Sequence, residues 1–175
     1  LNYHSKDISV ELSQERGKFP LFDQSFYPDG KLPFSGYKDK KSSSFDWKSL
    51  IEKVKKSGLR NSFTTVLAPT GSISMIAGCS SGIEPNYSLV FEKNVAVGSF
   101  YYVNPVFERI LFRHGLFNDQ LLRKVIDSNG SVQKISRIPE KLKQILVTSM
   151  DIEVEDHIKA LAAMQKWTDS SISKT

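Results

Sequence analysis

The feature that most constrains this chain is a short apolar run that stops at a proline and continues through a turn of small residues. Residues 62–68 read Ser-Phe-Thr-Thr-Val-Leu-Ala, a pattern typical of a short buried strand. Pro69 ends that strand because it has no N–H for a ladder hydrogen bond. Residues 70–72 then form a hydroxyl-rich turn, and residues 73–77 predict the opening of a helix. The order strand, tight turn, helix is typical of α/β folds.

This turn has the chemistry of an anion site. The first backbone N–H groups of a helix lack intrahelical partners, and the helix dipole favours negative charge there. The loop has neither the Gly-Lys-[Ser/Thr] ending of a P-loop nor the three spaced glycines of a dinucleotide fingerprint. We therefore expect backbone amides and hydroxyls to hold phosphate, and the predicted contacts are Thr70, Gly71, Ser72, Ile73 and Ser74. An ordinary strand-to-helix junction capped by Thr70 or Ser72 remains the alternative.

Strands and helices alternate along the chain, which predicts an α/β fold. The one long loop covers residues 23–44, and a loop of that size is unusual unless it is functional or disordered. The predicted helices cover residues 7–16, 46–57, 105–115, 118–130, 139–145 and a segment after Asp151, and the predicted strands cover residues 62–68, 87–97, 147–150 and 171–175.

Local signals mark several helix ends. Gly17 and Gly58 are predicted to end the first two helices, and Asn104 and Asn118 are predicted N-caps of two later ones. The last helix carries an apolar stripe that we expect to face a core. Its members are Ile158, Leu161, Ala162 and Trp167.

Four stretches of the sequence together resemble the large, catalytic chain of ribonucleotide reductases. They are Gly-Leu-Arg-Asn-Ser at 58–62, the run 69–85, Tyr-Tyr-Val-Asn-Pro-Val-Phe-Glu at 101–108 and the end of the chain, 164–175. The run Gly-Cys-Ser-Ser-Gly-Ile-Glu-Pro at 78–85 is most similar to the adenosylcobalamin-dependent (class II) branch. Ser-Ser-Ile at 170–172 departs from the Asn-Ala-Val or Asn-Ala-Ile usual before Ser-Lys-Thr, which puts local packing in doubt.

The resemblance implies that residues 1–175 are a section of a ten-stranded α/β barrel, incomplete on its own, with the substrate-phosphate loop at 69–74. It implies an oxidoreductase of deoxyribonucleotide synthesis and DNA replication, which converts ribonucleoside diphosphates or triphosphates by thiyl-radical chemistry. The implied cofactor is adenosylcobalamin, bound largely by parts outside these residues. The implied partners are the ribonucleotide substrate, the remainder of the reductase chain or a complementary subunit, and a second copy in a homodimer of the full enzyme.

Cys79 is the single cysteine, whereas the family's chemistry needs a thiyl-bearing cysteine and a separate reducing pair. The family's Asn-x-Cys-x-Glu segment is also absent, so Glu84 inherits no catalytic role. We therefore predict no catalytic residue, and we predict that the isolated 175 residues are inactive. Cys79 is expected to be a small buried residue, in line with the habit of free cysteine.

The remaining polar residues, His157 and Lys174, do not indicate a catalytic or metal site. His157 lies in an acid-rich stretch that suits a helix N-terminus better than a metal site, and its spacing matches no metal motif. Lys174 is expected to face solvent, because lysine is seldom buried. No metal site is predicted.

The formal net charge of +5 raises nucleic-acid binding as an alternative function. Its densest patches, residues 38–41 and 53–56, lack the interleaved aromatics of a stacking platform, so a solvated surface is favoured and nucleic acid is not an expected partner. No apolar run reaches membrane-spanning length and the first residues are not a signal peptide, so we expect a cytoplasmic protein without a membrane partner. An unrelated phosphate-binding α/β module and a basic, non-enzymatic nucleic-acid-binding protein stay open as alternatives.

Overall fold

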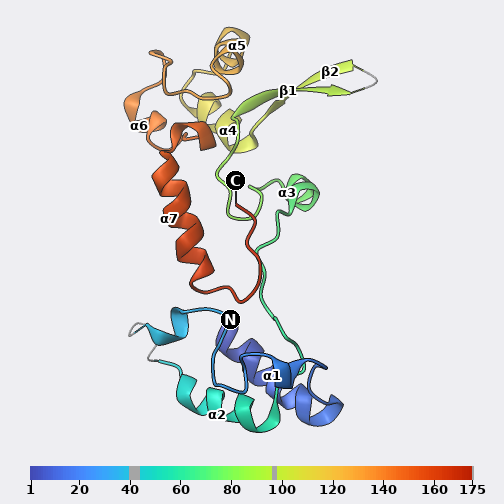
Figure 1. Cartoon of the computed structure of the whole chain (residues 1–175). Helices are drawn as coiled ribbons and strands as arrows, with labels where there is room; N and C mark the ends of the chain where they lie inside the picture. Colours follow the sequence, from blue (N-terminus) through green and yellow to red (C-terminus); the bar gives the residue numbers. More distant parts are fainter. Residues whose placement is uncertain (40–43, 96–97, 175) are drawn as a thin grey trace. The chain divides into compact units, whose positions relative to one another are not determined.

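The computed structural model describes residues 1–39, 44–95 and 98–174 (Figure 1). The chain divides into two compact units. Unit 1 comprises Leu1–Ala68 and Ile158–Ser173, and unit 2 comprises Pro69–His157 and Lys174–Thr175. The segment Pro69–His157 of unit 2 is therefore an insertion in the sequence of unit 1.

Two helices that pack against each other form the frame of unit 1. They are α1 (Asn2–Arg16) and α2 (Trp47–Ser57). The first helix begins at Asn2 rather than at the predicted Asp7. Gly58 ends α2 with a φ of 82°, which glycine adopts at little cost, and this predicted end is confirmed.

The core of unit 1 includes much of the predicted long loop. Residues 23–39 are not structureless, because they contribute buried aromatic side chains and the 3₁₀ turn η2 (Gly36–Lys38), and η1 (Phe22–Gln24) covers the start of the loop. Residues 40–43 of that predicted loop lie outside the described residues. The buried core residues are Val10, Phe22, Tyr27, Leu32, Phe34, Trp47, Leu50, Val54 and Leu59.

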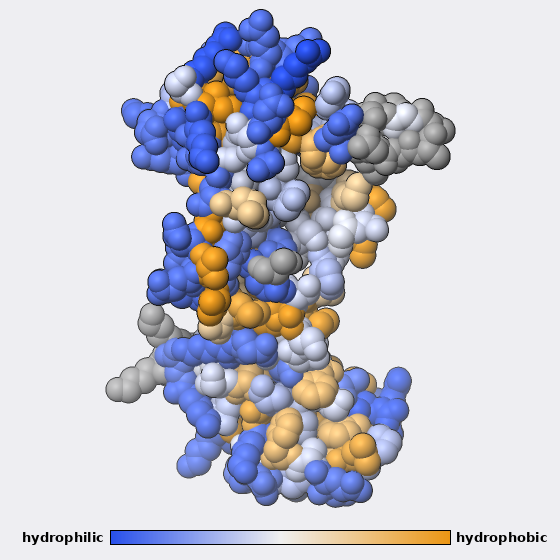
Figure 2. Space-filling view, turned by 45° about the horizontal axis from the view of Figure 1, so that its top comes forward, coloured by the Kyte–Doolittle hydropathy of each residue, from blue (hydrophilic) through white to orange (hydrophobic). Residues whose placement is uncertain are grey.

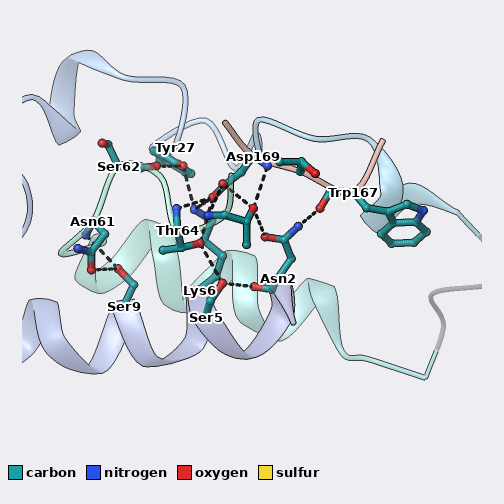
Figure 3. Close-up of polar contacts among 12 residues, drawn as sticks. Asn2, Ser5, Lys6, Ser9, Tyr27, Asn61, Ser62, Thr64, Trp167 and Asp169 are labelled. Atoms are coloured by element: carbon teal, nitrogen blue, oxygen red, sulfur yellow. Dashed lines mark hydrogen bonds and ion pairs between the residues drawn. The ribbon is translucent and has the colours of Figure 1, made fainter. Parts of the chain in front are cut away.

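A buried polar network ties α1 to two other segments of unit 1 (Figure 3). The Asp169 carboxylate accepts hydrogen bonds from the Lys6 ammonium and from the backbone N–H groups of Thr64 and Thr65, the latter two at 2.9 and 2.7 Å. Both charged side chains are 0% exposed. Burial by itself raises the pKa of Asp169, but hydrogen bonds from Lys6 and the threonines outweigh burial and hold that pKa below its ordinary value.

The predicted strands 62–68 and 171–175 meet at one point in the described residues. Leu67 and Ile172 form a single parallel bridge, with Leu67 accepting from Ser173 N–H at 2.8 Å. The expectation of a buried strand is wrong here, because Phe63 and Val66 are 49% and 59% exposed. A strand is buried only when neighbours cover both its faces and edges, and this segment has one bridge.

In unit 2, residues 90–95 of the predicted strand 87–97 form the first half of an antiparallel hairpin, and residues 96–97 of that prediction lie outside the described residues. Strand β1 (Val90–Val95) pairs with β2 (Gly98–Val103) in a register that runs from Val90↔Val103 to Val95↔Gly98. The sequence reasoning missed β2. The Phe91 and Tyr102 rings pack across the pair with centroids 4.8 Å apart.

Three helices and the base of the hairpin build the core of unit 2. They are α4 (Pro105–Arg113), α5 (Asp119–Asp127) and the short α6 (Glu140–Lys143). The side chains of Asn104 and Asn118 accept hydrogen bonds from N–H groups of the first turns of α4 and α5, so both predicted N-caps are confirmed. The buried core residues are Leu89, Val90, Phe107, Leu111, Leu121, Val125, Val132, Ile135, Ile138, Leu142 and Leu146.

The predicted strand 147–150 is wrong. The structure has a 3₁₀ turn there, η4 (Ser149–Asp151), with a capping box at its start. Asp151 accepts from Thr148 N–H at 2.8 Å and from the Thr148 hydroxyl at 2.7 Å, and Ser131 donates to the other carboxylate oxygen at 2.7 Å. Local side-chain hydrogen bonds therefore outweigh the β propensity of this stretch.

Helix α7 (Val154–Gln165) is confirmed as a helix, but the expected burial of its apolar stripe is wrong. None of its residues is buried among the described part of the chain, and Ile158 is 61% exposed. Trp167, just beyond the helix, is 39% exposed. Figure 2 shows hydrophobic residues along one side of this helix. Periodicity predicts which side is apolar and does not say what covers it.

Candidate phosphate-binding loop

The predicted loop lies where extended chain turns into α3 (Gly71–Ala77), which begins two residues before the predicted position 73. Thr70 immediately precedes this helix and has φ 55° and ψ 30°, in the left-handed region. A β-branched residue rarely adopts that conformation, so the turn is a strained one that its surroundings must hold in place.

The turn is not an ordinary capped junction. Thr70 occupies the N-cap position, but its side chain makes no capping hydrogen bond to α3. Its hydroxyl oxygen instead accepts from the backbone N–H of Gly82, at 2.9 Å. The hydroxyl proton of Thr70 can then point elsewhere, because the accepted bond uses only a lone pair.

The predicted site residues differ in how much they offer a ligand. Gly71, Ser72 and Ile73 are exposed, and a Cβ built on Gly71 meets no atom within 4 Å. Ser74 is buried, its N–H donates to Thr70 O at 2.8 Å, and its hydroxyl donates to Gly71 O at 2.8 Å. The accessible donors of this turn therefore belong to residues 70–73, and Ser74 would have to rotate its hydroxyl to join them.

A second segment braces the start of the loop, twelve residues further along the chain. Ser81 donates its hydroxyl to Pro69 O, and Gly82 donates its N–H to the Thr70 side chain. Glu84 N–H in turn donates to Ser81 O at 2.9 Å, which closes residues 81–84 into a turn. We call residues 81–84 the brace. The sequence analysis did not predict it, because no local sequence pattern indicates contacts between two loops.

Cys79 lies between the helix and the brace, and the expectation that it is buried is wrong. The thiol residue is exposed. Gly78, with φ 65°, ends α3, and Cys79 N–H donates to Ser74 O at 3.1 Å. Cys79 therefore belongs to a surface turn that no core cluster of the described residues includes.

Lys174 is not the solvent-facing lysine that we expected. Its side chain is 3% exposed, and its ammonium lies 2.7 Å from Glu84 Oε2 and 2.7 Å from His157 Nδ1. The other ring nitrogen of His157 lies 3.0 Å from Ser149 O. Because Nδ1 faces an ammonium, which only donates, Nδ1 accepts and Nε2 carries the proton that goes to Ser149 O. His157 thus has a partner on each side, beyond the helix-start role expected for it.

Comparison with known proteins shows the class of this chain. The sequence profile of the family described as "Ribonucleotide reductase, barrel domain" matches residues 1–175. The chain belongs to this family, and its fold class is confirmed as part of the reductase barrel domain. Membership decides against the alternative that the chain is a phosphate-binding module unrelated to this family.

Relatives come from more than one branch of the family. The chain is 35% identical over 176 residues to the vitamin B12-dependent ribonucleoside-diphosphate reductase of Thermoplasma acidophilum, covering 100% of this chain and 19% of the relative. It is 32% identical over 171 residues to the ribonucleoside-diphosphate reductase large chain of Encephalitozoon cuniculi, covering 98% of this chain and 22% of the relative. It is 34% identical over 172 residues to the ribonucleoside-diphosphate reductase large chain 2 of Saccharomyces cerevisiae, covering 98% of this chain and 20% of the relative.

The chain spans about a fifth of the length of these curated relatives. Similar identities to a B12-dependent enzyme and to large chains of other reductases leave the branch open, so the cobalamin-dependent assignment stays a prediction. Within the described residues, no helix is long and apolar enough to cross a membrane, and no group of three or more His, Cys, Asp or Glu side chains could hold a metal ion.

Proposed function

We propose that this chain is the part of a ribonucleotide reductase that holds the phosphate groups of the ribonucleotide, through residues Thr70–Ser74. The observation that carries the proposal is the exposed turn Gly71–Ile73, whose backbone is fixed by the left-handed Thr70 and by two bonds from residues 81–82. Family membership supports a ribonucleotide as the ligand. The complete protein would convert ribonucleoside diphosphates or triphosphates to deoxyribonucleotides.

The share of this segment in that reaction is positioning. Backbone N–H groups of residues 71–73 and the hydroxyls of Thr70 and Ser72 donate to phosphate oxygens, and such charge-assisted bonds are the strong ones. Anchoring the phosphates places the ribose against a radical-bearing cysteine on the remainder of the reductase chain or on a complementary subunit. Holding two reacting groups in fixed geometry lowers the barrier by replacing a bimolecular encounter.

The proposed cofactor is adenosylcobalamin, which supplies the initiating radical when bound. The B12 dependence in the name of the Thermoplasma relative supports it. We propose that the cofactor is bound largely by parts of the protein outside these residues, and we assign no residue of this chain to it. A homodimer of the full enzyme and a cytoplasmic location complete the proposal.

The test of the phosphate loop uses the complete reductase and isothermal titration calorimetry with a ribonucleoside diphosphate. Ser72→Ala should weaken binding about fivefold, since a charge-assisted hydrogen bond contributes about 1 kcal/mol or more. Gly71→Val should weaken it about tenfold or more, because the space around Gly71 is open in the fold and a side chain there would keep phosphate from the backbone. Ser80→Ala, also exposed but outside the turn, is the matched control.

Wild-type affinity in both loop variants would refute the phosphate role. A second assay addresses the isolated 175 residues, supplied with adenosylcobalamin, ribonucleotide and a dithiol. We expect no deoxyribonucleotide, because these residues hold one cysteine and the proposed chemistry uses three. Sustained product above a cofactor-free control would show that the active site lies within this chain.

A further inference from the structure

We propose that Lys174 and Glu84 form a positioning pair, whose ion pair sets the place of the phosphate-binding loop through the brace at residues 81–84. The proposal rests on the phosphate role of Thr70–Ser74. Neither side chain is given a contact with the ligand. Both act through backbone that touches the loop.

Hydrogen bonds link the phosphate-binding loop to Glu84 through the brace at residues 81–84. Pro69 and Thr70 are each bonded to the brace, by the hydroxyl of Ser81 and by the N–H of Gly82. Glu84 N–H closes the same turn on Ser81 O at 2.9 Å. Because residue 85 is proline, the backbone of Glu84 is restricted to extended conformations. The position of the Glu84 backbone and that of the loop are therefore coupled through a short, closed path.

Glu84 is in turn anchored by a buried cation. The Lys174 side chain is 3% exposed, whereas the Glu84 side chain is 23% exposed. A lysine so deeply buried requires a partner for its charge, because an uncompensated buried charge is costly. The 2.7 Å contact between Lys174 Nζ and Glu84 Oε2 supplies that partner. Lys174 therefore holds the Glu84 carboxylate at a fixed point beside the brace.

Lys174 is itself held in place by a second partner, His157. His157 accepts from Lys174 at 2.7 Å and its other nitrogen lies 3.0 Å from Ser149 O. Ser149 N–H donates to Asn86 O at 2.8 Å, two residues beyond Glu84. The contacts Glu84–Lys174–His157–Ser149–Asn86 thus return to the chain beside the brace. A closed set of bonds resists displacement better than a single ion pair, because no member can move alone.

The Lys174–Glu84 pair could instead only stabilise the fold of unit 2. The test must therefore separate an effect on the position of the phosphate-binding loop from an effect on folding. In the complete reductase, Lys174→Met and Glu84→Gln are measured for binding of a ribonucleoside diphosphate and of the same nucleoside without phosphate. We expect about tenfold weaker binding of the diphosphate and unchanged binding of the nucleoside. Lys143→Met is the matched control, because it removes another lysine of the same unit whose side chain is largely covered, at 13% exposed, and which pairs with Glu140 at 3.5 Å.

The charge-reversed double variant Glu84→Lys with Lys174→Glu adds a rescue. It should recover part of the diphosphate affinity that Glu84→Lys alone loses. Steady-state kinetics should show a raised KM for the diphosphate in Lys174→Met. If Lys174→Met fails to fold, Glu84→Gln decides, since its amide keeps the size of the side chain.

The outcomes distinguish failure of the positioning pair from failure of the phosphate loop. Loss of affinity in Ser72→Ala and Gly71→Val together with wild-type diphosphate binding in folded Glu84→Gln and Lys174→Met would overturn the positioning pair and leave the phosphate loop standing. Loss of nucleoside and diphosphate binding alike in Lys174→Met would also overturn it, as a general structural effect. Loss in Lys174→Met with unchanged Ser72→Ala and Gly71→Val would mean that Lys174 binds the ligand itself, which contradicts both proposals.

Discussion

Replacing Asp169 by asparagine tests the buried network of unit 1. In the native structure the carboxylate accepts from Lys6 and from both the N–H and the hydroxyl of Thr64 and of Thr65. The amide introduced by Asp169→Asn would keep one acceptor oxygen, but its NH₂ group would face donors. The Lys6 ammonium would lose its counter-charge while 0% exposed. Breaking a buried pair in this way costs about 3–5 kcal/mol.

Amide hydrogen exchange in the complete protein measures this cost locally. The Thr64 and Thr65 N–H groups donate directly to Asp169, so their exchange reports the network. A loss of about 3 kcal/mol or more should accelerate exchange by about two orders of magnitude or more. The control is Asp7→Asn, which removes the solvent-screened α1 pair with Lys53 and should leave exchange at Thr64 and Thr65 close to wild type.

The double variant Lys6→Met with Asp169→Asn tests whether the unpaired ammonium of Lys6 causes the loss of stability. It removes the stranded ammonium, so it should be more stable than Asp169→Asn alone. Exchange at Thr64 and Thr65 within about threefold of wild type in the single variant would refute the account of a charge-compensating network. Strict additivity of the two substitutions would refute it as well.

The same carboxylate makes a prediction about pH. Because the pKa of Asp169 is lower in the folded protein, its contribution to stability is fully present above the unfolded pKa of about 3.9. That contribution is lost as the pH falls through the folded pKa. Wild-type protection near Thr64 should therefore fall off in acid more steeply than protection in Asp169→Asn.

Three further predictions concern unit 2. Asp151→Ala removes the capping box with Thr148 and should destabilise the unit by about 1–2 kcal/mol in urea unfolding, whereas an unchanged midpoint would contradict the cap. Gly130→Ala should cost about 2 kcal/mol or more by the same measurement, because φ is 80° and the new Cβ would overlap the Ser88 side chain; native stability would show that the backbone there relaxes freely. Cys79→Ser should change stability by less than about 0.5 kcal/mol, as exposed substitutions do, and in the complete enzyme should leave turnover within about tenfold of normal. Abolished turnover with the fold intact would assign Cys79 a chemical role.

Local signals carried the successful parts of the sequence interpretation. The caps Asn104 and Asn118 act within three residues of themselves, so sequence alone specifies them. The same argument could have found the turn at 149–151, where Thr148 and Asp151 stand at capping-box spacing. The strand missed at Gly98–Val103 has the aromatic content of a strand, but the sequence interpretation assigned no element to residues 98–103.

Contacts between distant segments could not be predicted. Lys174 and Glu84 are 90 residues apart, and lysine is ordinarily solvated, so nothing local indicates its burial. The brace at Ser81 and Gly82 depends on how two loops meet, which periodicity does not encode. For the loop 70–74, the order of strand, turn and helix predicted where the turn lies. It did not predict the left-handed backbone of Thr70 or the hydrogen bond from the Ser74 hydroxyl to Gly71 O.

The insertion of unit 2 within unit 1 has a consequence for the order of events during synthesis. Lys6 on helix α1 precedes Asp169, whose carboxylate it must bind, by 163 residues, and Thr65 precedes it by 104 residues. Until Asp169 is synthesised, Lys6 lacks the counter-charge of that carboxylate, so the polar network around it stays open and solvated. Closing a flexible loop of 104 residues costs about 4 kcal/mol of chain entropy. Prior folding of Pro69–His157 would shorten the flexible part of that loop, so unit 2 should become protease-resistant on the nascent chain before unit 1 does.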